Sequence, residues 1–325
     1  MDDTAIESRL EVYRPELTGY CYRMLGSAFE AEDAVQDTMV RAWRGFDSFE
    51  GRAALRSWLY RIATNVCLNM LESAQRRMRP MDLGPAGSGR ATHPGEPRPD
   101  EIWVGPVPDT RLRPEGADPA DLIAERESVR LAFIAALQHL PPRQRAVLIL
   151  REVLAWSAQE VAELLDTSVA GVNSALQRAR AAIAAADTAA GAPLDDEQKS
   201  LLARYVRAFE AYDLEALTAL LRADATLSMP PLPLWLRGPD DIATWMAGTG
   251  SGCRGSRLVP VAANGMPAFG QYRPSPGGRG HDPWALIVLE TSAGRIAAVD
   301  NFLDTDRLFP LFGLPAHLEQ PARFG

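Results

Sequence analysis

Residues 157–183 read SAQEVAELLDTSVAGVNSALQRARAAI, and their apolar spacing is typical of a helix-turn-helix. The spacing predicts a short helix over 157–165, a turn at 166–168 and a longer second helix. On that second helix the apolar residues recur at steps of three and four, which predicts one buried face: Val169, Val172, Leu176, Ala179 and Ile183. The opposite face would then carry small and polar residues: Ala170, Gly171, Asn173, Ser174, Gln177, Arg178 and Ala181.

This polar face has the chemistry of a surface that reads DNA. Small residues at the start of a helix let it approach a major groove, and Asn, Gln and Arg side chains can bond base edges in pairs. The same spacing also fits a helical hairpin whose polar face is merely solvated. Spacing alone leaves both interpretations open.

The chain length indicates more than one domain, because 325 residues exceed the usual limit of a single hydrophobic core. The hydrophobic share of 46% and the charged share of 23% are typical of a soluble globular protein. No apolar run approaches the about 20 residues that span a bilayer, and the first residues do not resemble a signal peptide. We therefore expect a cytoplasmic protein without membrane contact. Cys21, Cys67 and Cys253 have no paired spacing, so neither a disulfide framework nor a zinc site is indicated, and we expect no metal and no cofactor.

The net charge of −8 argues against a protein that coats nucleic acid by bulk attraction. Residues 51–79 differ from the rest, because they hold six arginines against one glutamate. A polyanion is therefore expected to meet the chain at this segment.

Prolines and glycines divide the chain. Residues 80–124 hold nine prolines and six glycines, which predicts a linker without a long helix or strand. Apolar steps of three and four residues predict an all-helical domain before the linker and a second helical unit after it, up to about residue 186. Beyond residue 201 two short helices precede apolar segments at 225–229, 258–262, 285–291 and 295–299, which predicts an α+β domain.

Three stretches in two separate parts of the chain carry a family resemblance. LPPRQRAVLILREVLAWSAQEVAELL, residues 140–165, resembles region 4 of the bacterial extracytoplasmic-function sigma factors. EAEDAVQDTMVRAWRGFDSFEG, residues 30–51, resembles sigma region 2.2 with its following loop, and SWLYRIATNVCLN, residues 57–69, resembles regions 2.3 and 2.4. The resemblance implies a sigma factor that binds core RNA polymerase and directs promoter recognition and transcription initiation, and that is not an enzyme.

The resemblance also implies roles for named residues. A polar helix stripe opposite Val35, Met39 and Trp43 would dock on the β′ clamp helices of the polymerase: Asp33, Gln36, Asp37 and Arg41. Leu148 and Arg151 would lie near the β flap. The minus-ten element would meet Phe46, Ser48, Arg52, Arg56, Trp58, Arg61, Asn65 and Asn69. The minus-thirty-five element would meet Ser168, Ala170, Asn173, Ser174, Gln177, Arg178 and Arg180. From the residues alone, a solvated acidic helix and core packing of Trp58 remain alternatives.

In the linker, EIWVGPVPD at 101–109 resembles a stretch found in sigma factors that carry an extra C-terminal domain. Trp103 is its one bulky side chain, and we expect it to dock on the domain cores or on the polymerase. A surface tryptophan in a disordered tether is the alternative.

Residues 198–305 resemble the SnoaL-like, nuclear-transport-factor-like cone, with helices followed by a curved antiparallel sheet. Leu201, Tyr205, Phe209 and Tyr212 have helical spacing and are expected in its core. His281 lies in the glycine-rich GGRGHDP segment and is expected in a loop, so no titratable pair for cyclase chemistry is evident. We therefore expect a regulatory domain that contacts the two sigma domains. The apolar tail around 306–315 is expected to dock in a groove between the cone and a sigma domain.

The predicted architecture is thus multidomain, with two all-α sigma domains and an α+β cone. Its parts are a region 2 helical bundle at 8–78, the linker at 79–124, a region 4 helix-turn-helix at 125–186, the cone at 198–305 and the tail at 306–325. Two alternatives remain: a ligand-sensing helix-turn-helix regulator, and a SnoaL-like cyclase fused to a DNA-binding unit.

Overall fold

The structure is a computed structural model that describes residues 3–49, 54–73, 76–112, 128–184 and 196–319. The chain forms two compact units. Unit 1 comprises Met1–Arg77 and Glu101–Thr188, and unit 2 comprises Met78–Asp100 and Ala189–Gly325. Within the described ranges, no helix has both the length and the apolar character to cross a membrane.

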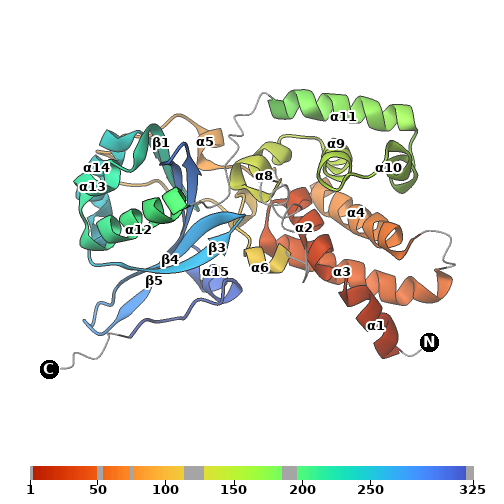
Figure 1. Cartoon of the computed structure of the whole chain (residues 1–325), viewed down its shortest axis with the longest axis horizontal. Helices are drawn as coiled ribbons and strands as arrows, with labels where there is room; N and C mark the ends of the chain where they lie inside the picture. Colours follow the sequence, from red (N-terminus) through yellow and green to blue (C-terminus); the bar gives the residue numbers. More distant parts are fainter. Residues whose placement is uncertain (1–2, 50–53, 74–75, 113–127, 185–195, 320–325) are drawn as a thin grey trace. The chain divides into compact units, whose positions relative to one another are not determined.

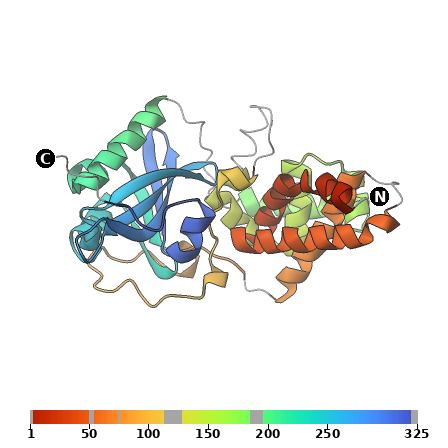
Figure 2. The same cartoon turned by 90° about the horizontal axis from the view of Figure 1, so that it is seen from below.

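The first half of unit 1 is a helical bundle (Figures 1 and 2). Its elements are α1 (Asp3–Glu11), α2 (Arg14–Leu25), α3 (Ala28–Gly45), η1 (Phe46–Ser48) and α4 (Leu55–Ser73). Helix α2 ends at Gly26, whose φ of 73° is left-handed, and Ser27 then caps α3 by accepting a hydrogen bond from the Glu30 amide. Val35 and Met39 are buried as predicted, but Trp43 is 42% exposed and does not belong to the core.

The second half of unit 1 is the predicted helix-turn-helix with two helices before it. It contains α8 (Leu131–Gln138), α9 (Pro142–Leu148), η3 (Ile149–Val153), α10 (Ala158–Leu164) and α11 (Val169–Ala184). Proline at the start of α9 suits a first helical turn, where no amide hydrogen is needed. Helix α9 packs against α11 and also against α2 and α4, so regions 2 and 4 share one compact unit.

The linker is divided between the two units. It holds three short helical elements that its composition did not predict: α5 (Pro80–Leu83), η2 (Asp100–Ile102) and α6 (Asp109–Leu112). Residues 78–100 belong to unit 2, and the described residues from 101 to 112 belong to unit 1.

Unit 2 is an α+β cone. Its helical elements are α12 (Asp196–Ala211), α13 (Leu214–Thr218), α14 (Pro239–Ala247), η4 (Thr249–Cys253) and α15 (Thr305–Leu311). Its strands are β1 (Leu221–Met229), β2 (Leu232–Arg237), β3 (Arg257–Ala263), β4 (Met266–Pro274), β5 (His281–Ser292) and β6 (Arg295–Phe302). The sheet order is β2-β1-β6-β5-β4-β3, with β1 and β6 parallel and all other neighbours antiparallel. The four predicted strand segments are confirmed, whereas β2 and β4 were not predicted.

Alternation along β4 assigns the two faces of the sheet. Phe269 joins Tyr205 and Phe209 of α12 in the main core, together with residues of α13 and α14. Tyr272 points to the opposite face, where its ring centroid lies 5.1 Å from that of Phe309 of α15. The core role predicted for the α12 aromatic residues is confirmed.

The apolar tail packs on this opposite face. Tyr272 donates a hydrogen bond to the Pro315 carbonyl at 2.8 Å, and Leu314 fills the space above Gly270. His281 and Leu318 form an antiparallel bridge. The tail therefore packs on the cone as predicted, because the alternation of β4 leaves an apolar outer face for it to cover. Its predicted contact with a sigma domain stays a prediction.

Candidate nucleic-acid interface

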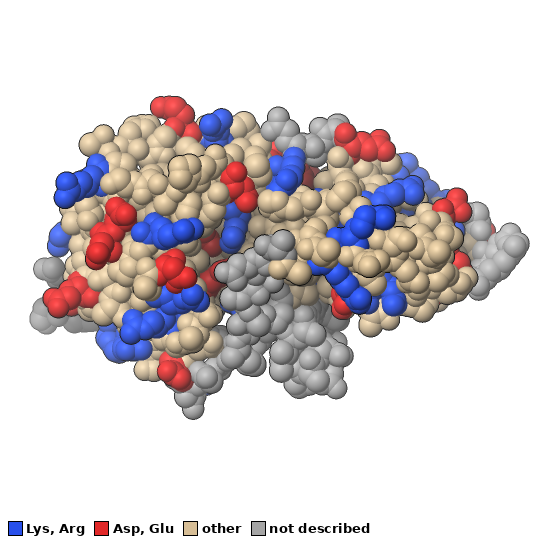
Figure 3. All heavy atoms as spheres, turned by 90° about the horizontal axis from the view of Figure 1, so that it is seen from above, with Lys and Arg blue, Asp and Glu red and all other residues tan. Residues whose placement is uncertain are grey.

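Helix α11 presents a polar face to solvent. Val172, Leu176 and Ala179 are buried as predicted, whereas Val169 is 37% exposed and the prediction of its burial was wrong. Val169 is the first residue of α11, where no preceding turn covers the side chain. The residues predicted to meet the minus-thirty-five element are all exposed: Ser168, Ala170, Asn173, Ser174, Gln177, Arg178 and Arg180. Figure 3 views the molecule from above relative to Figure 1, and in its right-hand part Lys and Arg side chains form a diagonal band.

Local hydrogen bonds cap the starts of α10 and α11. Ser157 and Glu160 form a capping box at the start of α10, and these bonds lower the pKa of Glu160. Asp166 adopts a left-handed φ of 50° in the turn. Ser168 accepts a hydrogen bond from the Gly171 amide at 3.0 Å, and a Cβ at Gly171 would lie 2.8 Å from Thr167 Oγ1. Ser168 therefore caps the helix, and Gly171 allows the tight turn.

Arg180 has an acidic partner that the sequence pattern did not indicate. Its Nη2 atom lies 2.5 Å from Glu152 Oε1 of η3. This pair orients the arginine along the outside of the helix-turn-helix. Arg178 has no ion pair among the described residues and faces solvent.

Helix α4 carries the second candidate surface. Arg61, Asn65 and Asn69 are exposed and repeat every four residues, so they form one stripe along the helix. Trp58 is half-buried, and its ring lies 5.0 Å from Phe49 and 6.4 Å from Phe46. This aromatic cluster lies near the N-terminal end of α4, where the stripe begins. Arg52 and the side chain of Ser48 lie outside the described residues.

Region 4 covers part of the α4 stripe. The Tyr60 and Trp156 rings lie 5.1 Å apart, and the Arg56 guanidinium lies 5.5 Å from the Trp156 ring while pairing with Glu16 at 2.9 Å. Arg61 donates a hydrogen bond to the Glu163 carbonyl at 2.9 Å. A groove of 680 Å³ lies between the two regions, lined by Arg61, Asn65, Leu68, Arg143, Glu163, Leu164, Leu165 and Asp166. In this structure three of the minus-ten candidates, Arg56, Arg61 and Asn65, therefore face region 4.

A buried arginine fastens region 4 to region 2. Arg145 of α9 is 3% exposed and donates hydrogen bonds to the Met24 carbonyl and to Gln138 Oε1. It also donates to the Gln138 and Leu140 carbonyls, each at 3.2 Å. Burial lowers the pKa of Arg145 to about 10, so the guanidinium stays charged at neutral pH. The sequence singled out no role for this residue, because neither charge pattern nor periodicity distinguishes it from a surface arginine.

The candidate polymerase stripe on α3 is open to solvent in part. Asp33 and Gln36 are exposed, and Asp37 pairs with Arg41 one turn later at 2.8 Å. Leu148, in contrast, is 4% exposed and lies in the core of region 4. The predicted contact of Leu148 with the polymerase therefore does not fit this structure, because the Leu148 side chain is buried.

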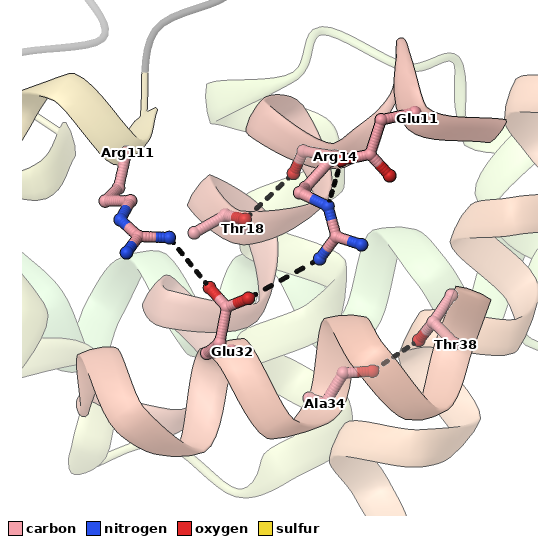
Figure 4. Close-up of polar contacts among 7 residues, drawn as sticks. All are labelled: Glu11, Arg14, Thr18, Glu32, Ala34, Thr38 and Arg111. Carbon is pink, nitrogen blue, oxygen red and sulfur yellow. Dashed lines mark hydrogen bonds and ion pairs between the residues drawn. The ribbon is translucent and has the colours of Figure 1, made fainter. Parts of the chain in front are cut away.

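The second half of the linker docks on region 2. Trp103 is 4% exposed, and its carbonyl accepts a hydrogen bond from Arg77 at 2.7 Å. Tyr22 donates a hydrogen bond to the Gly105 carbonyl at 2.8 Å. Figure 4 shows Arg111 of α6 and Arg14 of α2 reaching the same carboxylate, Glu32, each at 3.5 Å. The expectation that Trp103 docks on a domain core is confirmed, and the alternative of a solvated tether is wrong.

The first half of the linker packs against the cone. We call its residues 84–98 the strap. Asp241 accepts a hydrogen bond from the Gly89 amide at 2.6 Å, and Thr249 donates to the Ala91 carbonyl at 2.8 Å. Backbone bonds join Gly87 to the Trp235 carbonyl at 2.8 Å and Arg98 to the Pro231 carbonyl at 2.9 Å. Residues 78–100 of the segment that joins region 2 to region 4 are therefore part of the folded cone unit.

The cone shows no constellation for acid–base catalysis at His281. This residue is the first of β5 and not a loop residue, and its Nε2 atom bonds the Gly255 carbonyl at 3.1 Å. The neighbouring Asp282 pairs instead with His317 at 2.9 Å, at the protein surface. Across the described ranges, no group of three or more His, Cys, Asp or Glu side chains could hold a metal ion.

Comparison with known proteins agrees with this division of the chain. Sigma-70 region 2 matches residues 10–77, Sigma-70 region 4 matches residues 130–183, and the SnoaL-like domain matches residues 202–299. The ECF RNA polymerase sigma factor SigG of Mycobacterium tuberculosis is 46% identical over 318 residues, which cover 95% of this chain and 83% of SigG. SigJ of the same organism is 25% identical over 92% of each chain. The crystal structure of SigJ shares the fold, with a TM-score of 0.62 over 95% of this chain and 99% of SigJ, at 23% identity.

These relationships confirm the predicted fold class and the prediction of a sigma factor that is not an enzyme, and they set aside the cyclase alternative. The region 2 match also speaks against a free-standing helix-turn-helix regulator. The chain therefore belongs to the extracytoplasmic-function RNA polymerase sigma factors and carries a SnoaL-like domain after its region 4.

Proposed function

We propose that this protein binds core RNA polymerase through the α3 stripe and reads promoter DNA through α4 and α11. The observation that carries this proposal is the pair of exposed polar stripes on the two helices that the sigma region matches predict to meet DNA. Asn, Gln and Arg on α11 supply base-edge donors and acceptors. Arg61, Asn65 and Asn69 on α4, beside the aromatic cluster of Trp58, supply phosphate contacts and a stacking surface for a melted strand.

Region 4 must leave α4 before the minus-ten element binds. Support comes from the Arg61 bond to the Glu163 carbonyl and from the stacking of Arg56 on Trp156, because both contacts occupy side chains that the DNA would need. The two contacts are partly exposed and of modest strength, about 0.5–2 kcal/mol each. Binding to polymerase can therefore supply the free energy to separate them.

The cone regulates this opening through the strap. Part of the chain between regions 2 and 4 belongs to the cone unit. The largest separation that regions 2 and 4 can reach from each other therefore depends on whether the strap stays bound to the cone. Contacts between the cone and the sigma domains remain a prediction.

The test is reconstitution with purified core RNA polymerase. Co-elution and promoter-specific run-off transcripts are expected from the wild-type chain. Arg61→Ala and Arg178→Ala should each reduce transcripts about tenfold without loss of co-elution, because one good contact to a base or phosphate is worth about 1–3 kcal/mol. The matched control is Arg204→Ala on the exposed face of α12. Duplex DNA binding without polymerase, together with no co-elution, would favour the ligand-sensing regulator.

A further inference from the structure

The cone encloses a cavity of 250 Å³ between its helices and the inner face of its sheet. Most of its wall is apolar and aromatic, with Tyr205, Phe209, Leu227, Ile242, Trp245 and Val299 among the lining residues. An apolar cavity of about 150 Å³ holds a benzene ring, so this one has room for one or two rings. Its predominantly apolar lining with a few polar groups is that of a small-molecule site.

One side of the cavity carries a positive charge. Arg273 follows Phe269 and Gln271 on the inward face of β4, and Gln271 and Arg273 line the cavity. Its guanidinium carbon lies 3.2 Å from the centroid of the Trp284 ring, and its Nη2 atom bonds Cys253 Sγ at 3.1 Å. Its Nε atom is buried and has no hydrogen-bond partner within the part of the chain that the structure describes.

No carboxylate among the described residues pairs with Arg273. A guanidinium beside an apolar cavity is costly to leave without an anion, because the surroundings replace little of its hydration. Arginine also presents a planar pair of donors that matches the two oxygens of a carboxylate.

The rim of the cavity adds a second observation. Trp284 is 39% exposed, although a large aromatic ring at the end of a sheet would ordinarily be covered. On the strap, Pro94 lines the cavity, and its carbonyl accepts a hydrogen bond from the Leu234 amide at 3.3 Å. The linker between the sigma regions therefore supplies part of the wall.

We propose that the cone binds a small aromatic acid of one or two rings, with its ring in the apolar cavity and its carboxylate on Arg273. Trp284 and Trp245 stack against the ring, and Pro94 of the strap closes over it. This binding does not depend on the polymerase, so its test is independent of the proposed sigma activity.

The experiment is calorimetric titration of the full chain with 2-naphthoate and with its neutral analogue 2-naphthalenemethanol. We expect the acid to bind at least about tenfold more tightly than the alcohol, because a charge-assisted hydrogen bond contributes more than one factor of ten. Arg273→Gln should abolish that preference and leave the weak binding of the alcohol unchanged. Arg279→Gln, in the exposed loop between β4 and β5, is the matched control and should behave as wild type.

Equal binding of the acid and the alcohol by the wild-type chain would overturn the proposal, and so would binding of neither. These two outcomes do not depend on the folding of any variant. For Arg273→Gln, circular dichroism and an unchanged melting temperature show that the cone is intact. Retention of the acid preference in an intact Arg273→Gln chain would also refute the assigned anchor.

Discussion

Replacing Gly89 by alanine should release the strap from the cone. A Cβ at this position would lie 2.1 Å from the Asp241 carbonyl oxygen and 2.8 Å from the Asp241 carbonyl carbon. Both obstacles are backbone atoms, so no side-chain rotation relieves the clash. The strap must move away from the start of α14, and the hydrogen bond from the Gly89 amide to the Asp241 carboxylate is lost with it.

The size of the effect follows from the bonds that hold the strap. The bond to the Asp241 carboxylate is worth about 1.5–3 kcal/mol, and the neighbouring bonds at Gly87 and Ala91 are worth about 1 kcal/mol each. Loss of the first bond and weakening of the other two costs about 3 kcal/mol. A free-energy change of that size raises the population of the detached strap by about 100-fold.

Limited trypsin digestion measures this population, because Arg90 is exposed within the strap and is followed by alanine. When opening and closing are fast relative to cleavage, the cleavage rate after Arg90 follows the detached fraction and should rise by about two orders of magnitude. The matched control is Gly84→Ala, since nothing lies within 4 Å of a Cβ there and its φ of 169° is ordinary extended backbone. Equal cleavage rates in the two variants would refute the assignment of the strap to the cone. The same pair of variants in run-off transcription tests the proposed control of region 4.

Three further substitutions test other parts of the structure. Arg145→Ala should lower the unfolding free energy of unit 1 by about 3 kcal/mol, because it removes the hydrogen bond to the Met24 carbonyl and leaves a cavity. The control Arg143→Ala, at an exposed position, should change the unfolding free energy by less than about 0.5 kcal/mol. Chemical denaturation followed by circular dichroism measures both values. Burial raises the pKa of Asp300 on β6, so the native cone holds this proton more tightly than the unfolded chain does. The stability of the cone should therefore fall as pH rises through that pKa. Asp300→Asn should flatten the pH dependence of the melting temperature, and an unchanged pH dependence would contradict the burial argument. Arg178→Ala should leave complex formation with core polymerase intact while relaxing the preference among minus-thirty-five sequences, which a promoter library read by transcript sequencing would reveal.

The amino-acid sequence determined the local elements and the family. Steps of three and four apolar residues were enough to predict the helix-turn-helix, and Val172, Leu176 and Ala179 are buried as that pattern required. The first-domain helices and four of the strands followed in the same way, because side-chain periodicity reports which face of an element is covered. The pattern was less informative at element ends, where Val169 and Trp43 are exposed because no neighbouring turn or helix covers them.

Only the tertiary structure decided how distant segments use one another. Composition predicted residues 80–124 as a linker, yet its described part forms a strap on the cone and an anchor on region 2, through single hydrogen bonds such as those of Gly89 and Gly105. Arg145 and Arg273 are two of many arginines in the sequence, and only the fold buries one between the sigma regions and places the other at an apolar cavity. Such roles depend on residues far apart along the chain, and the hydrophobic period of one segment carries no information about them.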